Sequence, residues 1–366
     1  MKVLVVEKTK LTGNIEKIKN HAKKTNAKVI AMIKGNGYGL GLCEFAKCLC
    51  MNGIDFLAVS TLDEAVKLAK CNLDTPIMLL SPICNVEEAK IAADNDIIMT
   101  ISSAESAMAA DIAAKNKNKT LKIQLAIDTG FGRFGFLYNN MSEAAKIILS
   151  LEKCEIVGCF SHFSDAFSKS STHTTAQFNR FCSAVQDLSL RGIDVKMRHI
   201  CNSSAFLKYN NMHLDAVRIG SAFLGRVLVK NELQLEKIAY LESEICEIKT
   251  LPPGYNIGYA NTYKTKKETK IAVIPVGYMD GFGVVKKDDT YRFFDCARYI
   301  YHNVCSIFKD MRTYVKIKNT PCPILGRISM FNIVADVSGK DVFCGDKVVL
   351  ECNPILIDSA VVRQYR

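Results

Sequence analysis

The sequence predicts an α/β chain with two domains, an N-terminal (β/α)8 barrel of the TIM type and a C-terminal, mainly β domain. The chain has 366 residues, which exceeds the usual size of a single domain. Eight short apolar runs alternate with helical segments in its first part, and β-like runs separated by turn signals replace this alternation after about residue 230. We therefore expect the barrel at 10–230 and the β domain at 231–366, together with residues 1–9.

The eight expected barrel strands are short, and most are rich in Val, Ile, Leu or Phe, as strands buried on both faces are. They are Val29–Lys34, Phe56–Ser60, Ile77–Ser81, Ile97–Ile101, Ile123–Asp128, Ile156–His162, Met197–Asn202 and Ala216–Ser221. Helical spacing appears at Asn14–Thr25, Leu62–Cys71, Val86–Asn95, Ala104–Asn116, Met141–Lys153 and Thr174–Arg191. A doubly wound sheet is the competing fold, but the count of eight and the lack of a GxGxxG motif after the first strand favour the barrel.

The second part of the chain shows β-like runs with turn signals between them. The runs are Lys270–Val276, Thr313–Ile317, Ile333–Val337 and Lys347–Glu351, and the turn signals are PPG at 252–254, Asp280–Gly281 and Gly345–Asp346. The stretch Lys286–Arg312 carries charges, aromatic residues and two cysteines, and its pattern predicts no element.

Composition excludes several classes of function. The formal charge is +11, but the lysines are spread along the chain, so we expect solvated surface and no nucleic-acid partner. No apolar run reaches the length of a membrane span, and the opening MKVLVVEKTK lacks the pattern of a signal peptide, so we expect a cytoplasmic protein with no membrane partner. The 15 cysteines form no facing CxxC pairs, which favours reduced, mostly buried cysteines and no metal site.

Polar residues mark the carboxyl ends of the expected barrel strands, where barrel enzymes place their active sites. They are Lys34, Ser60, Ser81, Asp128 to Arg133, His162, Asn202, Ser203, Arg218, Gly220 and Ser221. Asp128 reads best as a cap at the end of its strand.

Lys34 is the strongest candidate for chemistry. Glycines 35, 37, 39 and 41 follow it and allow close approach of the backbone to a ligand. A lysine in a dry pocket loses its proton readily, as a nucleophile that attacks a carbonyl requires. Loops after the last two barrel strands often bind phosphate, and Asn202 with Ser203 and Gly220 with Ser221 fit that role. A nucleophilic lysine beside a phosphate site suggests pyridoxal phosphate.

At this point the sequence resembles the alanine racemases, which are fold-type III pyridoxal-phosphate enzymes. The matching segments occur in the family's order over nearly the whole chain. They are KGNGYGLG at 34–41, DTGFGRFGF at 128–136, SHF at 161–163, HICNSSA at 199–205, VRIGSAFLG at 217–225, GYANTY at 258–263, PVGYMDGF at 275–282 and GRISM at 326–330. The resemblance implies racemisation of a small amino acid, with L-alanine to D-alanine as the first expectation and cell-wall precursor supply as the family's usual role.

The resemblance also implies a two-base mechanism. Lys34 would hold the cofactor and act as the base on one face of the substrate carbon, and Tyr259 would act on the other face. In the family the matching tyrosine reaches the site from the partner subunit, so a homodimer with shared sites is implied.

Further roles follow from the resemblance at matching positions. Arg218 would face the pyridine nitrogen with His199 supporting it, and Arg133 would contact the cofactor phenolate and the substrate carboxylate. The backbone at Met330 would help to bind that carboxylate. The remaining residues would line the cofactor, hold its phosphate or line the entrance; they are Tyr38, His162, Asn202, Ser203, Gly220, Ser221 and Tyr278.

Three departures from the family cluster at the substrate end. Ala126 stands where the family often has a carbamylated lysine, Phe331 stands where it usually has aspartate, and the chain after GDKVVL at 345–350 is short. The alternatives left open are a racemase of serine or of a larger amino acid, a non-catalytic pyridoxal-phosphate-binding protein and, ranked below them, a fold-type III decarboxylase.

Overall fold

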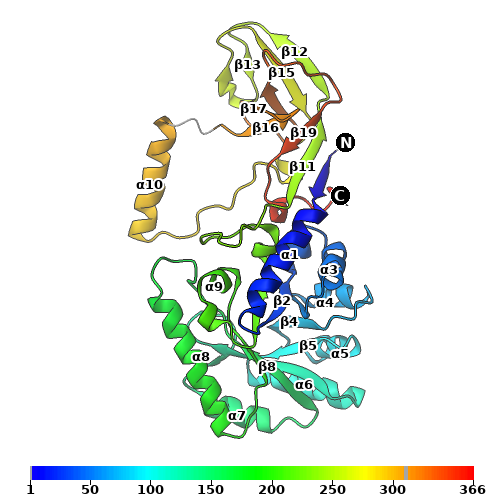
Figure 1. Ribbon diagram of the computed structural model, residues 1–366, viewed down its shortest axis with the longest axis vertical. Helices are drawn as coiled ribbons and strands as arrows, with labels where there is room; N and C mark the ends of the chain where they lie inside the picture. Colours follow the sequence, from blue (N-terminus) through cyan, green and yellow to red (C-terminus); the bar gives the residue numbers. More distant parts are fainter. Residues whose placement is uncertain (1, 309–311) are drawn as a thin grey trace. The chain divides into compact units, whose positions relative to one another are not determined.

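The computed structural model describes residues 2–308 and 312–366 and divides into two compact units (Figure 1). One unit is Lys8–Ile238. The other combines the N-terminal residues up to Glu7 with Ala239–Arg366.

The unit Lys8–Ile238 is a closed barrel of eight parallel strands, so the predicted fold class is confirmed. The strands are β2 (Lys28–Met32), β3 (Phe56–Val59), β4 (Ile77–Pro82), β5 (Ile98–Ile101), β6 (Leu121–Asp128), β8 (Cys154–Phe160), β9 (Met197–His199) and β10 (Ala216–Ile219). Each strand pairs with its neighbours in this order, and β10 pairs with β2 to close the ring. The two-residue β7 (Phe136–Leu137) lies beside β6.

Helices separate the strands as the sequence predicts. They are α1 (Lys8–Lys23), α3 (Leu42–Met51), α4 (Leu62–Ala69), α5 (Val86–Asp94), α6 (Ala104–Lys117), α7 (Met141–Leu149), α8 (Thr172–Leu190) and α9 (Ser203–Lys208), with the short turns η1 (Asn210–Met212) and η2 (Ser221–Leu224). Side chains of Thr61, Asn85 and Ser103 accept hydrogen bonds from the first turns of α4, α5 and α6, which fixes where these helices begin. α1 begins six residues before the predicted Asn14.

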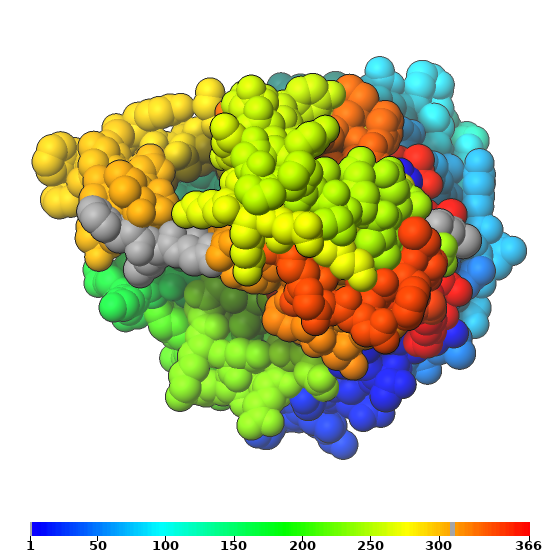
Figure 2. All heavy atoms as spheres, turned by 90° about the horizontal axis from the view of Figure 1, so that it is seen from above, coloured from blue at the N-terminus to red at the C-terminus, as the bar shows by residue number. Residues whose placement is uncertain are grey.

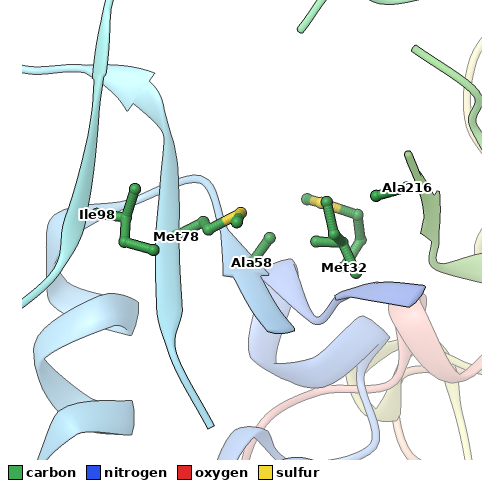
Figure 3. Close-up of a cluster of buried hydrophobic side chains, with 6 residues drawn as sticks. Met32, Ala58, Met78, Ile98 and Ala216 are labelled. Carbon is green, nitrogen blue, oxygen red and sulfur yellow. The ribbon is translucent and has the colours of Figure 1, made fainter. Parts of the chain in front are cut away.

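Alternate residues of each strand point into the barrel. Ile30, Met32, Ala58, Met78, Ile98 and Ala216 form one buried apolar cluster there, contributed by five strands (Figure 3). This cluster forms the apolar interior of the barrel.

The second unit is built on a nine-stranded sheet, as the predicted β domain requires. Its strand order is β12-β15-β18-β17-β16-β19-β11-β1-β20. The strands are β1 (Val3–Val6), β11 (Ala239–Glu244), β12 (Glu247–Leu251), β15 (Thr269–Ile274), β16 (Tyr314–Ile317), β17 (Thr320–Leu325), β18 (Ile333–Asp336), β19 (Lys347–Leu350) and β20 (Val362–Tyr365). A separate pair, β13 (Asn256–Ile257) and β14 (Tyr263–Lys264), and the short turns η3 (Tyr259–Asn261), η4 (Tyr278–Asp280) and η5 (Pro354–Leu356) complete it.

The stretch Lys286–Arg312, which the sequence pattern left without an element, contains the helix α10 (Phe293–Phe308). In Figure 1 this helix lies apart from the strands of its own unit, and Figure 2 shows the gold-coloured part of the chain that contains it as spheres. Phe293, Phe294, Ile300, Tyr301 and Ile307 are between 65% and 83% exposed.

The cysteines differ from expectation. The structure joins Cys43 to Cys71 in a disulfide, so the expectation that all cysteines are reduced is wrong for this pair. Of the free cysteines, only Cys159, Cys201, Cys322 and Cys352 are buried, so most are not. Among the described residues, no helix is both long and apolar enough to cross a membrane.

Candidate active site

A pocket of about 540 Å³ opens at the carboxyl ends of the barrel strands. Its lining contains all nine cofactor-binding residues that were predicted in the barrel. They are Lys34, Tyr38, Arg133, His162, Asn202, Ser203, Arg218, Gly220 and Ser221. The structure therefore brings together residues that are up to 187 positions apart in the chain (221 minus 34).

The sequence suggested that Lys34 ends the first strand, and the structure corrects this position. β2 ends at Met32, and Lys34 begins a left-handed turn, labelled α2 (Lys34–Tyr38), in which Gly35, Asn36 and Gly37 have φ between 52° and 66°. Glycine adopts this conformation without strain, which suits Gly35 and Gly37, and Asn36 and Tyr38 adopt it as well. Burial, followed by the charges of Arg133 and Arg218, lowers the pKa of the Lys34 amine.

Arg218 is a buried cation whose described hydrogen bonds go to imidazole nitrogens and backbone carbonyls and to no carboxylate. Its Nη1 donates to Nδ1 of His199 at 2.7 Å and to the His199 carbonyl at 3.0 Å. Its Nη2 donates to the Ser161 carbonyl at 2.6 Å and to Nδ1 of His162 at 3.1 Å. Burial lowers the pKa of Arg218 to about 10 and that of His162 to about 3, so at neutral pH the arginine is charged and the histidine is neutral.

Tyr38 and Gly220 form one wall of the pocket. A Cβ atom at Gly220 would overlap the Tyr38 ring and its hydroxyl, so any side chain here would require the Tyr38 ring to move. The Gly220 amide donates to Ser203 Oγ at 3.1 Å, and Asn202 Oδ1 accepts from the Ala205 amide at 3.0 Å at the start of α9. The wall therefore consists of small hydroxyl and backbone groups, which suit a phosphate.

Arg133 lies in the loop after β6, beside the position where the sequence departs from the family. Ala126 is buried and lines the pocket with no carboxylate to offer. The Arg133 guanidinium instead lies 4.5 Å from the centroid of the Phe131 ring and 5.3 Å from that of Phe134. Aromatic rings thus support this cation where the family often uses a carbamate.

Asp128 holds the same loop and is not free to bind a ligand cation. Its Oδ1 accepts from the amides of Gly130 and Phe131 at 2.8 and 2.9 Å. This is the cap at the end of the strand that the sequence favoured. Lys34, Arg133 and Arg218 outnumber this carboxylate in the lining, so the pocket has a positive potential that suits anionic ligands.

The remaining predicted residues lie together on the β unit. A Cβ at Gly258, beside Tyr259, would contact Arg327, and one at Gly277 would overlap the carbonyls of Ser329 and Met330. The Tyr278 amide donates to the Ser329 carbonyl at 3.1 Å. Three loops therefore pack side by side, and Tyr259, Tyr278 and Met330 are 70%, 45% and 45% exposed.

Phe331 belongs to the same three-loop surface and is 50% exposed. Lys2 Nζ lies 5.5 Å from the centroid of its ring and also pairs with Asp280 at 2.6 Å. Phe331 thus replaces the aspartate that is usual in the family, and the cation beside it, Lys2, has Asp280 as its carboxylate partner.

Sequence reasoning missed the residues beneath the pocket. Gln124 Oε1 accepts from Nε2 of His199 at 3.1 Å, and Phe160 stacks on the same imidazole with 5.4 Å between ring centroids. A glutamine in the middle of the apolar run LKIQLAID, two positions before Ala126, was the available signal. Thr129 and Ser161, whose hydroxyls are 2.7 Å apart, lie within segments that the sequence analysis named, but their pairing had no sequence signal.

Comparison with known proteins gives a consistent relationship over both units. The family model for the alanine racemase N-terminal domain matches residues 6–226, and that for the C-terminal domain matches residues 238–360. The alanine racemase of Clostridium tetani is 35% identical, covering 94% of this chain and 84% of its own, and that of Methanococcus maripaludis is 33% identical, covering 92% and 87%.

Solved structures agree. The alanine racemase of Clostridium difficile 630 superposes with a TM-score of 0.86 at 27% identity, covering 100% of this chain and 95% of its own. The same protein in complex with cycloserine gives a TM-score of 0.82 at 26% identity, covering 99% and 88%. The chain belongs to the alanine racemase family and is an amino-acid racemase.

Proposed function

We propose that the protein is a pyridoxal-phosphate-dependent alanine racemase that uses Lys34 and Tyr259 as its two bases. The observation that carries the proposal is the pocket itself. It contains a lysine of lowered pKa, a wall of small hydroxyl and backbone groups, and two further cations. The space beside Gly220 fits a phosphate group, because a larger residue at this position would fill that space next to Tyr38. Pyridoxal phosphate supplies an aldehyde that bonds to an amine and a ring that withdraws electrons from the substrate carbon.

Each part of the pocket has a role in this proposal. Ser203, Gly220, Ser221 and Tyr38 would hold the phosphate, and His162 and Asn202 would line the ring. Arg218 would donate a hydrogen bond to the pyridine nitrogen, and because an arginine keeps its protons, that nitrogen would stay unprotonated. This arrangement limits electron withdrawal and disfavours reactions other than proton exchange.

The proton steps fall to two groups. The Lys34 amine, with its lowered pKa, would accept or return the α-proton on one face of the substrate. The Tyr259 hydroxyl would do so on the other face. Arg133 and the Met330 backbone would hold the substrate carboxylate, which keeps the α-carbon between the two bases.

We further propose a homodimer in which each β unit completes the partner's site. Tyr259, Tyr278 and Met330 form one exposed surface, and a catalytic tyrosine that is 70% exposed needs a second surface to enclose it. The family resemblance supports the same arrangement.

The test is α-proton exchange in deuterated water, followed by NMR with the cofactor-loaded protein and a panel of L-amino acids. Exchange and a D-product with alanine would support the proposal, while exchange confined to serine or to a larger amino acid would reassign the substrate. Tyr259→Phe should abolish racemisation and leave the visible absorbance of bound cofactor unchanged. Full racemisation by this variant would contradict the two-base assignment, and no exchange with any substrate would favour a cofactor-binding protein without catalysis.

A further inference from the structure

A second cavity, of about 890 Å³, lies at the amino ends of the barrel strands, opposite the pocket described above. The first residues of five strands line it: Lys28, Phe56, Ile77, Ile98 and Met197. Barrel interiors are ordinarily filled by side chains, and this end ordinarily serves stability alone. A hollow of this size is within the range of small-molecule sites, about 300–1,000 Å³.

The inner wall of this cavity is apolar. Ile98 belongs to the central cluster drawn in Figure 3, and Phe56, Val157 and Met197 pack against that cluster while lining the cavity. Met32, from the same cluster, lines the pocket at the other end of the barrel. The apolar cluster therefore lies between the two cavities, and it offers a ligand in the second cavity a hydrophobic surface.

The rim of the cavity carries two inward-facing lysines on opposite sides. Lys28 precedes Ile30 by two residues and Lys122 precedes Gln124 by two, so both side chains point to the barrel interior. Their strands, β2 and β6, are four places apart in either direction around the ring of eight. Lys28 Nζ lies 5.8 Å from the centroid of the Phe56 ring, a position that places a cation directly beside the apolar wall.

Most other charges at this rim are already paired. Asp215 accepts from Arg198 Nε at 2.7 Å and from Nη2 at 3.0 Å. Asp96 pairs with Lys119 at 3.1 Å, and Lys196 pairs with Glu155 at 2.5 Å. Asp74 is the one further carboxylate in the lining, and Glu155 lies opposite Lys122 in the pairing of β6 and β8. Among the described contacts, Lys28 and Lys122 make no ion pair within 4 Å, so their ammonium groups are the cations that this rim can offer to a ligand.

We propose that this cavity binds small organic anions that combine an apolar, preferably aromatic body with a carboxylate. The body would lie on the wall made by Phe56, Val157 and Met197, and the carboxylate would face Lys28 and Lys122. The apolar body supplies affinity through its burial, and the anionic group selects against neutral and cationic molecules of the same shape. Amino-acid racemisation does not use this end of the barrel, so the site is additional to the active site.

The experiment uses the cofactor-loaded protein and 2-naphthoate as the probe, with calorimetry as the readout. We expect saturable binding of one molecule per chain, at least about tenfold tighter than that of the neutral 2-naphthamide. Excess alanine should not displace the probe. Displacement by alanine would place the probe in the active site and overturn the proposal.

Two sets of variants locate the site. Lys28→Met/Lys122→Met should weaken naphthoate binding about tenfold or more, whereas the matched control Lys24→Met/Lys47→Met, at exposed lysines outside the cavity, should not. Val157→Phe should block binding while cofactor absorbance and thermal unfolding stay as in the parent. Unchanged binding in both cavity variants, or no saturable binding at concentrations on the order of 1 mM, would overturn the proposal.

Discussion

The Arg218 guanidinium donates a hydrogen bond from Nη1 to Nδ1 of His199 at 2.7 Å. Because arginine is only a donor, Nδ1 of His199 must accept, and the imidazole therefore carries its hydrogen on Nε2. That hydrogen faces Gln124 Oε1 at 3.1 Å. The chain Arg218–His199–Gln124 thus fixes one tautomer and keeps the arginine charged without a carboxylate beside it.

Replacing His199 should destabilise the protein through Arg218. In His199→Leu a buried N–H of the guanidinium loses one of its acceptors, which we expect to lower the free energy of unfolding by about 1–3 kcal/mol in urea denaturation. His199→Gln offers an oxygen acceptor and should recover part of the loss. His173→Leu, at an exposed histidine of α8, is the matched control and should have little effect. Equal losses for the two leucine variants would contradict this role of His199.

His162 and His199, which surround Arg218, should make stability fall at mildly acidic pH. Burial lowers the pKa of His162 from 6.5 to about 3, and it lowers the pKa of His199 in the same direction. Between about pH 6.5 and about pH 3 the unfolded chain therefore binds a proton at position 162 that the folded chain does not. The free energy of unfolding should decrease as pH falls through this window, by up to about 1.4 kcal/mol per pH unit for that residue.

His162→Asn tests this linkage. Its Oδ1 can accept from Arg218 as the histidine Nδ1 does, but the side chain does not titrate. Urea denaturation at several values between pH 5 and pH 7 should show a shallower pH dependence for the variant than for the parent. Parallel curves would mean that His162 takes up its proton equally in the folded and unfolded states.

The sequence predicted the barrel well because its signals are local and repeated. Each strand is a short apolar run, and the residues at the strand ends share one pocket because parallel strands end at the same face. The left-handed turn at Lys34 was only implied by its glycines, because nothing in Val29–Ile33 marks where the strand stops. Gln124 was overlooked since its importance depends on His199, which is 75 residues away.

The helix α10 could not be assigned for a different reason. Its β-branched and aromatic residues, including Tyr299, Ile300, Tyr301 and Val304, favour strands over helices. Ile300, Tyr301 and Val304 are between 48% and 70% exposed, so no buried face of this segment produces a helical period in the sequence. The proposed placement of Tyr259 opposite Lys34 of a partner chain rests on the family resemblance, and no local pattern of the sequence indicates it.

Adding one methyl group at Gly220 should cost cofactor affinity. The Cβ of Gly220→Ala would overlap the Tyr38 ring, so the ring must move out of the position in which it borders the phosphate site. We expect the dissociation constant for pyridoxal phosphate, measured from the visible absorbance of the bound form, to rise about tenfold or more. Gly13→Ala, in α1 with open space around its Cβ, is the matched control. Unchanged affinity for Gly220→Ala would remove Tyr38 and Gly220 from the phosphate site.

Mixed dimers show whether Tyr259 acts in the site of its own chain or in the site of the partner chain. Lys34→Ala and Tyr259→Phe should each be inactive as homodimers, because every site lacks one base. When the two chains are co-expressed and assemble at random, each heterodimer contains one site with both bases and one with neither. Since about half of the dimers are heterodimers and half of their sites are intact, about one quarter of the parent racemase activity should return.

The controls for this mixture follow from the same geometry. Combining both substitutions in one chain and mixing it with the parent also gives heterodimers, but each of their sites then lacks one base. Such heterodimers should add nothing to the activity of the parent homodimers. If the single variants failed to complement each other while both formed dimers and Tyr259→Phe still bound cofactor, Tyr259 would serve the barrel of its own chain, and the exposed surface of Tyr259, Tyr278 and Met330 would need another explanation.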